Sequence, residues 1–314
     1  MEQAKVVAIG GGTGLSVLLR GMKTLPIDIS AIVTVADDGG SSGRLREELA
    51  IPPPGDVRNV LVALAEVEPM IEELFQHRFE NGTGLNGHSL GNLLLAGMTS
   101  ITGDFARGIS EISAVLNVRG RVLPASNQSI HLQAVMEDGS IVKGESQIPK
   151  ANKRIHRVRL QPNYVEPLAE SIEAVQEADL IVIGPGSLYT SILPNLLVPG
   201  ITDAIRASSA PTIYISNVMT QAGETDGYSV YDHVKGIHDH VGEGLIQKVL
   251  VDSSNIPAAT LARYQSEGSE PVDCDRERLE QAGIHLIQDV FVQHFEGTLR
   301  HDAKKVAHSL LAQM

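Results

Sequence analysis

The chain has 314 residues, of which 42% are hydrophobic and 20% are charged, so it can bury a sizeable core in one large α/β domain or two smaller ones. Its 38 acidic and 25 basic residues give a formal net charge of −13, which disfavours general nucleic-acid binding. The single cysteine, Cys274, excludes an intrachain disulfide. No leader-like segment and no run of about 18 apolar residues is present, so we expect a cytoplasmic protein without a membrane span.

Five apolar segments rich in β-branched residues predict strands that are buried on both faces. They are KVVAIG (5–10), ISAIVTVAD (29–37), ADLIVIGPG (178–186), PTIYISN (211–217) and KVLVDS (248–253). Helical stretches separate them, which favours βαβ units and a parallel sheet. The sequence therefore predicts an α/β fold with a Rossmann-like, doubly wound and mainly parallel sheet.

Two regions interrupt this alternation. The residues from about 56 to 117 have helical periodicity and predict a helical insert. Within a patch from about 121 to 162, HLQAVMEDGSIVKGE (131–145) alternates around a Glu-Asp-Gly turn and predicts a small antiparallel β-hairpin, which RIHRVRLQP (154–162) extends. No clear linker or internal repeat is present, so we expect residues 1–314 to form a single domain. The exposed hairpin edges are compatible with a homodimer.

A glycine-rich segment follows the first predicted strand and opens a helix. Backbone N–H groups and a positive helix end attract phosphate there, and glycine lets the backbone approach closely. Leu15 breaks the dinucleotide fingerprint at its last position, and no Walker lysine follows. The segment predicts either a non-standard phosphate loop or a tight structural turn. The candidate ligand-binding residues are Gly11, Gly12, Thr13 and Gly14.

The second predicted strand ends in DDGGSSGRLREEL (37–49). The adjacent carboxylates of Asp37 and Asp38 are candidate catalytic groups and candidate Mg²⁺ ligands, because this ion binds carboxylate together with phosphate oxygen. Ser41, Ser42 and Arg44 add donors for an anion. The alternative is an ordinary polar helix start that Ser41 or Ser42 caps.

Polar residues also open two helices of the predicted insert. Asp56 can cap the first of them, and either a structural or a binding role fits its neighbours Arg58 and Asn59. His88 and Asn92 are one turn apart, so both can face one pocket. A purely structural role for His88 is the alternative.

Small polar residues follow the strands predicted at 178–186 and 211–217 as well. Gly186 and Ser187 follow the first of these strands, and Asn217 follows the second. The carboxyl ends of parallel strands lie at one edge of a sheet, so these residues and the first glycine loop predict a common ligand-binding edge.

Two residues in the last third of the chain are further candidates. Tyr264 lies in ARYQSEGSEPVDCD (262–275), which we expect to be a loop, and could stack on a ring. Arg300 lies near the start of a helix predicted over 297–311 and could bind a pyrophosphate through two hydrogen bonds. The alternative for both is an ordinary surface position.

These segments together resemble the YvcK-type (GlmR-type) gluconeogenesis factors, which belong with the phospholactate transferases of the CofD-like group. The matching stretches are AIGGGTGLS, VADDGGSSGRLR, PPGDVRNVL, GHSLGNLLL, GPGSLYTSILPNLLVPGI, NVMTQAGETDGYSVYDHV and LRHDAKKVA, and they extend from residue 8 to residue 307.

The resemblance implies a Rossmann-like domain that binds UDP-N-acetylglucosamine and supports cell shape and wall-precursor supply on gluconeogenic carbon. Residues 11–14 and Asn217 would lie at the nucleotide, and Tyr264 and Arg300 match sugar-nucleotide contacts of such proteins. The transferase branch uses Mg²⁺ to move a phospholactyl group onto a deazaflavin. No residue of this chain is matched to its deazaflavin pocket.

Three functions remain as hypotheses. The first is a regulatory protein that binds UDP-N-acetylglucosamine and acts through a partner, such as an enzyme of amino-sugar synthesis. The second is a Mg²⁺-dependent nucleotidyl- or phospho-transferase that uses Asp37 and Asp38. The third is an NAD-dependent oxidoreductase, against which the broken fingerprint argues.

Overall fold

The centre of the molecule is a parallel sheet of seven strands. A computed structural model describes residues 3–67, 69–295 and 298–314. The strand order is β10-β9-β8-β7-β1-β2-β3, and every neighbouring pair is parallel. The strands are β1 (Ala4–Gly10), β2 (Ile27–Val33), β3 (Arg121–Pro124), β7 (Leu180–Ile183), β8 (Thr212–Ile215), β9 (Lys248–Asp252) and β10 (His285–Asp289). The predicted Rossmann-like fold is thereby confirmed.

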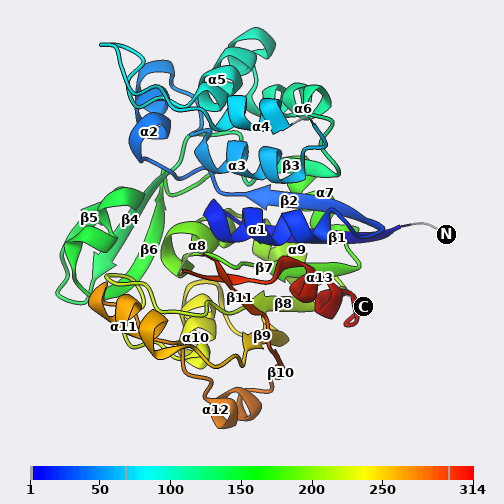
Figure 1. The fold of residues 1–314 in the computed structure, drawn as a ribbon, viewed down its shortest axis with the longest axis vertical. Coiled ribbons are helices and arrows are strands. Elements are labelled where there is room, and N and C mark those ends of the chain that lie inside the picture. Colours follow the sequence, from blue (N-terminus) through cyan, green and yellow to red (C-terminus); the bar gives the residue numbers. More distant parts are fainter. Residues whose placement is uncertain (1–2, 68, 296–297) are drawn as a thin grey trace.

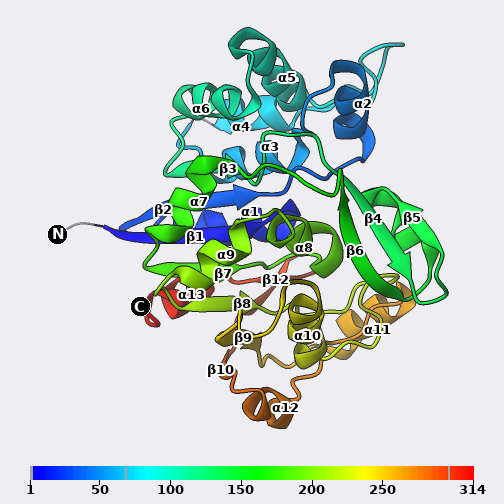
Figure 2. The same cartoon turned by 180° about the vertical axis from the view of Figure 1, so that it is seen from behind.

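Helices cover both faces of this sheet. α1 and α13 lie in front of it in Figure 1, and α7, α8 and α9 lie in front of it in the reverse view of Figure 2. The helices are α1 (Gly12–Met22), α2 (Gly40–Leu49), α3 (Gly55–Leu64), α4 (Pro69–Gln76), α5 (Leu90–Thr102), α6 (Phe105–Val115), α7 (Ala169–Gln176), α8 (Leu193–Leu196), α9 (Ile201–Ala207), α10 (Val230–Val241), α11 (Ala258–Ser266), α12 (Arg276–Gln281) and α13 (Ala303–Leu311). In the part of the chain that the structure describes, no helix combines the length and the apolar character needed to cross a membrane.

The helical insert and the antiparallel element are present as predicted. α3 to α6 form the insert, in which α3 packs beside α1 against β2 and β3, and three strands form a separate antiparallel sheet in the order β5-β4-β6. These strands are β4 (His131–Met136), β5 (Ile141–Lys143) and β6 (Ile155–Gln161). Two short 3-10 helices, η1 (Glu145–Gln147) and η2 (Pro149–Ala151), connect β5 to β6. His240 of α10 joins this sheet to the rest, because its Nε2 accepts the N–H of Val158 at 3.0 Å.

Two local predictions near the end of the chain are wrong. Arg300 lies in β12 (Thr298–His301), which pairs antiparallel with β11 (Val292–Phe295), and not in a helix. The last helix begins only at Ala303, because the Asp302 carboxylate accepts the N–H of Lys305 and caps it there. Tyr264 lies in α11 and not in a loop, since the alanine-rich segment after Pro257 favours a helix.

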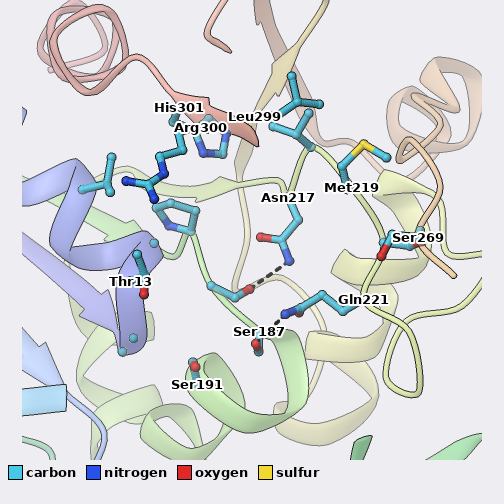
Figure 3. Close-up of a pocket in the computed structure, with 18 of the residues that line it drawn as sticks. Thr13, Ser187, Ser191, Asn217, Met219, Gln221, Ser269, Leu299, Arg300 and His301 are labelled. Carbon is cyan, nitrogen blue, oxygen red and sulfur yellow. Dashed lines mark hydrogen bonds between the residues drawn. The ribbon is translucent and has the colours of Figure 1, made fainter. Parts of the chain in front are cut away.

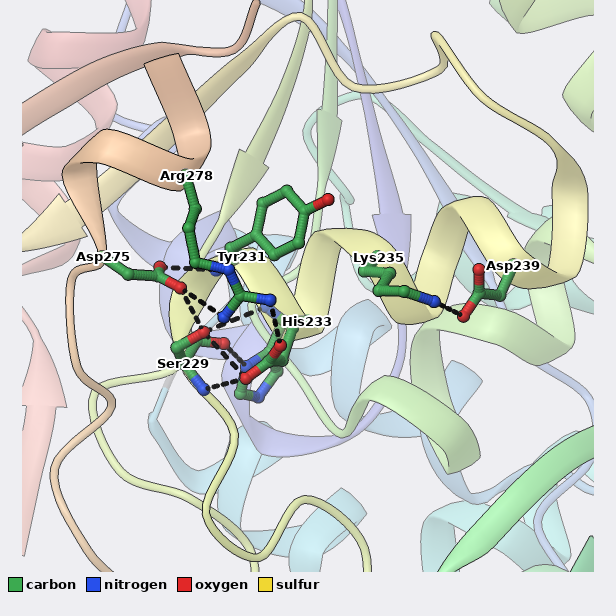
Figure 4. A network of polar contacts seen from close by, with 8 residues as sticks. Ser229, Tyr231, His233, Lys235, Asp239, Asp275 and Arg278 are labelled. Carbon is green, nitrogen blue, oxygen red and sulfur yellow. Dashed lines mark hydrogen bonds and ion pairs between the residues drawn. The ribbon is translucent and has the colours of Figure 1, made fainter. Parts of the chain in front are cut away.

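A paired polar network holds α12 against the start of α10 (Figure 4). Ser229 and Asp232 form a capping box, each side chain accepting from the backbone N–H of the other. Asp275 accepts the Ser229 hydroxyl at 2.6 Å and the Tyr231 N–H at 3.0 Å. Arg278 contacts Asp232 at 3.1 Å and Asp275 at 3.0 Å, and its guanidinium lies 4.2 Å from the centre of the Tyr231 ring. Every charged group of this network has a partner within it.

Candidate functional site

A cavity of about 490 Å³ lies at the carboxyl ends of β1, β7 and β8, which are neighbours in the sheet. The loops after these three strands line it with residues 11–14, 185–187 and 217–221, as the sequence predicted for this edge. Residues 299–301 of β12 and Tyr264 of α11 close the other side. The structure thus brings the predicted glycine loops, Asn217, Tyr264 and Arg300 to one place, while their binding roles stay predictions.

The first glycine loop presents the start of α1 to this cavity. Gly11 is its N-cap, with φ of −171° and no side-chain cap, so the first helical amides depend on other partners. The carboxylate of Asp56 accepts the Gly12 N–H. A Cβ at Gly14 would lie 2.7 Å from the Pro185 oxygen, so only glycine lets the two loops touch here.

Side-chain amides fix the other two loops to each other (Figure 3). Asn217 Nδ2 donates to the Gly186 oxygen at 3.0 Å, and Gln221 Nε2 donates to Ser187 Oγ at 2.7 Å. The Oε1 atom of Gln221 is buried and has no partner among the described residues. Donors and acceptors at this wall are therefore held in place before any ligand arrives.

The wall formed by β12 contains both predicted residues. The hydroxyl of Tyr264 accepts the N–H of Leu299 at 3.0 Å, so α11 holds β12 in place. Arg300 extends from β12 toward the α1 side of the cavity in Figure 3. A cation opposite a helix N-terminus and a glycine loop is an arrangement suited to a diphosphate.

His301 also lines this cavity, although it is not among the residues predicted from the sequence. Its side chain is 9% exposed and hydrogen-bonds to the backbone of Ser216. Burial lowers the pKa of His301 to about 4, so the imidazole is neutral at pH 7. Its Nε2 is buried without a partner in the described part of the chain, which leaves a hydrogen-bonding position for a ligand.

The second glycine cluster lines a different and smaller cavity. Asp37, Ser41, Ser42 and Asn92 surround a space of about 270 Å³ together with residues of α3. Asp56 belongs to this cavity and also separates it from the first, since a Cβ at Gly11 would lie 2.6 Å from its Oδ2. The expected ligand-binding residues are therefore divided between two adjoining cavities.

Three of the predicted residues line neither cavity, and each contacts another part of the protein. Asp38 Oδ1 accepts the N–H of Ser146 in η1 at 2.8 Å. Arg44 donates to the Asn86 oxygen at 2.9 Å. His88 is buried and its Nδ1 lies 2.9 Å from Ser41 Oγ. The structural alternative accounts for the contacts of all three side chains.

Asp37 faces Asp56 and not its neighbour Asp38. Burial, assisted by the charge of Asp37, raises the pKa of Asp56 to about 7. Within the described residues, no group of three or more His, Cys, Asp or Glu is arranged to hold a metal ion. Two carboxylates and a ligand phosphate are a donor set that Mg²⁺ accepts, so Asp37 and Asp56 fit this ion better than the predicted adjacent pair.

Comparison with known proteins agrees with this architecture. The family model for the 2-phospho-L-lactate transferase CofD matches residues 6–292. The chain is 65% identical to the gluconeogenesis factor of Halalkalibacterium halodurans over 99% of this chain and 97% of that protein. It is 57% identical to the gluconeogenesis factor of Bacillus subtilis, over 99% of this chain and 98% of that protein.

A solved structure has the same fold. The crystal structure of protein BH3568 from Bacillus halodurans superimposes with a TM-score of 0.97 at 64% identity, and covers 99% of this chain and 100% of that chain. A second crystal structure of that protein, described as a member of the UPF0052 family, gives a TM-score of 0.96. The chain therefore belongs to the CofD family, and its close relatives are proteins named gluconeogenesis factor.

Proposed function

We propose that the 490 Å³ cavity binds a nucleotide sugar, UDP-N-acetylglucosamine, and that the protein is a regulatory binding protein. The observation that carries this proposal is the convergence of two glycine loops, the start of α1 and Arg300 on one cavity. The amides and the cation suit the diphosphate. Tyr264, Asn217 and the unpartnered His301 Nε2 offer contacts for a ring and for hydroxyl groups.

The resemblance to gluconeogenesis factors supplies the biological side of the proposal. The protein would act in the cytoplasm, support cell shape and wall-precursor supply on gluconeogenic carbon, and respond to the level of the nucleotide sugar. Its partner would be a protein of amino-sugar synthesis, and it would form a homodimer. The names of the relatives support the link to gluconeogenesis.

Replacing Arg300 tests the ligand directly. R300A is expected to weaken binding of UDP-N-acetylglucosamine by about 1.5–3 kcal/mol, because one charge-assisted hydrogen bond to the pyrophosphate is lost. Isothermal titration calorimetry measures the change. R263A is the matched control, because Arg263 is exposed, pairs with Glu267 and does not line the cavity. Unchanged affinity of R300A would show that Arg300 is not part of the site. If the unaltered protein binds NAD or GDP more tightly than UDP-N-acetylglucosamine, the proposed ligand is wrong.

The second candidate function is Mg²⁺-dependent nucleotidyl or phosphoryl transfer of the CofD type. The observation in its favour is the pair Asp37 and Asp56 in the smaller cavity, of which Asp56 also adjoins the larger one. D37N is expected to abolish Mg²⁺-dependent turnover of a nucleotide sugar and to leave its affinity within about twofold, since Asp37 does not line the larger cavity. If the unaltered protein shows no turnover with Mg²⁺ under any condition, this function is excluded.

A further inference from the structure

The smaller cavity contains polar groups that the protein itself does not satisfy. It lies between the start of α2, the first turn of α3 and the start of α5, and it adjoins the larger cavity at Asp56. Its volume of about 270 Å³ is below the usual range of about 300–1,000 Å³ for drug-sized ligands. A ligand of this cavity would therefore be a compact metabolite.

One end of the cavity is suited to an anion. α2 is ten residues long, its N-cap Gly39 provides no side-chain cap, and the first helical hydrogen bond runs from Gly43 N to the Gly39 oxygen. The amides of the residues between them point out of the helix start, where its dipole is positive. Arg58 and Arg78 line the same cavity and add two cations.

Arg58 is the most informative of these groups. Its side chain is 7% exposed, and its two terminal nitrogens donate to neutral oxygens, Ser89 Oγ at 2.6 Å and Asn59 Oδ1 at 2.7 Å. Its Nε is buried without a hydrogen bond, and in the described part of the chain no carboxylate forms an ion pair with it. The charges of Asp37 and Asp56 in the same cavity act on this guanidinium, but its Nε has no acceptor among the described residues, so an anion can take that position.

The other end of the cavity is suited to hydroxyl groups. Asn92 is 2% exposed, its Nδ2 donates to Ser42 Oγ at 3.4 Å, and its Oδ1 is buried with no partner among the described residues. Asp37 and Asp56 add carboxylate oxygens, which accept hydrogen bonds from hydroxyls. These oxygens cannot accept a hydrogen bond from a deprotonated phosphate, but they can accept hydrogen bonds from the hydroxyl groups of a polyol.

We propose that this cavity is a second binding site, whose ligand is a small phosphate ester that carries free hydroxyl groups. The phosphate would lie at the start of α2 between Arg58 and Arg78, and the hydroxyls would point toward Asn92 and Asp37. None of the described residues that line the cavity is aromatic, so a flat ring system has no stacking partner there. The proposal concerns the smaller cavity alone and does not depend on the ligand of the larger one.

The test uses calorimetric titration of the full chain with glycerol 3-phosphate, and in parallel with inorganic phosphate and with glycerol. We expect saturable binding of the ester, weaker binding of phosphate and no binding of glycerol. R78Q is expected to lower the affinity for the ester about 10- to 100-fold, because a charge-assisted contact is lost. Arg78 is exposed and donates only to the Gly87 oxygen, so its replacement leaves the fold intact.

Two variants locate the ester. R107Q removes the same charge from an exposed arginine of α6 and is expected to leave the affinity unchanged. R300A, in the larger cavity, is also expected to leave it unchanged. If R300A weakens ester binding and R78Q does not, the ester occupies the larger cavity and the proposal is overturned. No saturable binding, or equal binding of phosphate and ester, would overturn it as well.

Discussion

The starts of α10 and α2 show two ways in which a fold can treat the free amides of a helix. At α10, Ser229, Asp232, Asp275 and Arg278 satisfy one another in a closed network. At α2, Gly39 provides no cap, and the nearby Arg58 donates to two neutral oxygens while its buried Nε has no acceptor among the described residues. The first arrangement stabilises the protein by itself, whereas the second leaves hydrogen-bonding capacity for a ligand. α1 resembles α2 in this respect, since Gly11 provides no side-chain cap.

The largest effect on the free energy of unfolding is expected from disrupting the closed network at the start of α10. D275A removes the acceptor of the Ser229 hydroxyl and the Tyr231 N–H and leaves Arg278 with one carboxylate. The free energy of unfolding should fall by about 2–3 kcal/mol, because a partly buried charged acceptor is lost. Urea denaturation measures this change.

The control for that experiment is a surface pair on the same helix. Asp239 pairs with Lys235 where both side chains are more than half exposed. D239A should change the free energy of unfolding by no more than about 0.5 kcal/mol. Equal effects of the two variants would contradict the distinction between the network and an ordinary ion pair.

A buried carboxyl that forms no ion pair within the described part of the chain, such as Glu224, should respond to pH in the opposite sense to a paired one. Burial raises the pKa of Glu224 to about 7, although Thr190 donates a hydrogen bond to it. The folded state then holds a proton that the unfolded state has lost, so stability is greatest below about pH 4.5 for this group and falls as pH rises to about 7. E224Q should flatten this decline, as urea denaturation at pH 5 and pH 8 would measure. Burial also raises the pKa of Asp56 to about 7, so part of the decline should persist in E224Q, and an unchanged slope would show that Glu224 does not contribute to it.

The smallest effect is expected from capping α2. G39S supplies a hydroxyl at the N-cap, where φ of −79° permits serine and the new Cβ would lie 3.2 Å from the movable Asp37 carboxylate. It should raise the free energy of unfolding by a few tenths of a kcal/mol. The serine hydroxyl would accept a hydrogen bond from a backbone N–H that we assign to the phosphate, so the affinity for glycerol 3-phosphate should fall. Denaturation and titration of one variant therefore test whether stability and binding change in opposite directions. A gain in both would contradict the assignment of these amides.

The sequence predicted the central strands well because their residues are buried on both faces and form continuous apolar runs. It did not indicate β10, whose five residues are mostly exposed and show no such run. β3 has only four residues and was included in the predicted hairpin patch. The sequence predicts a helix at Arg300 because the pairing of its strand with β11 cannot be read from one short segment.

The site was predicted only in part, for similar reasons. Loops after parallel strands meet at one edge, so residues 11–14, 185–187 and 217–221 could be grouped from the sequence. Asp37 and Asp38 were expected to act together, but adjacent residues of an extended segment point in opposite directions, and only Asp37 faces the cavity. Arg78 and His301 come from a loop and an edge strand, and only tertiary structure brings them to a site.

The larger cavity takes its walls from opposite ends of the sequence, residues 11–14 and 299–301, with α13 packed on α1 behind them. During translation the glycine loop leaves the ribosome among the first segments, whereas β12 is the last strand of the described chain to follow. A nascent or proteolytically shortened chain that stops before residue 299 would hold the loop without its opposite wall. Binding of the proposed nucleotide sugar would therefore require a chain that extends past β12, and shorter fragments would not compete with finished molecules for it.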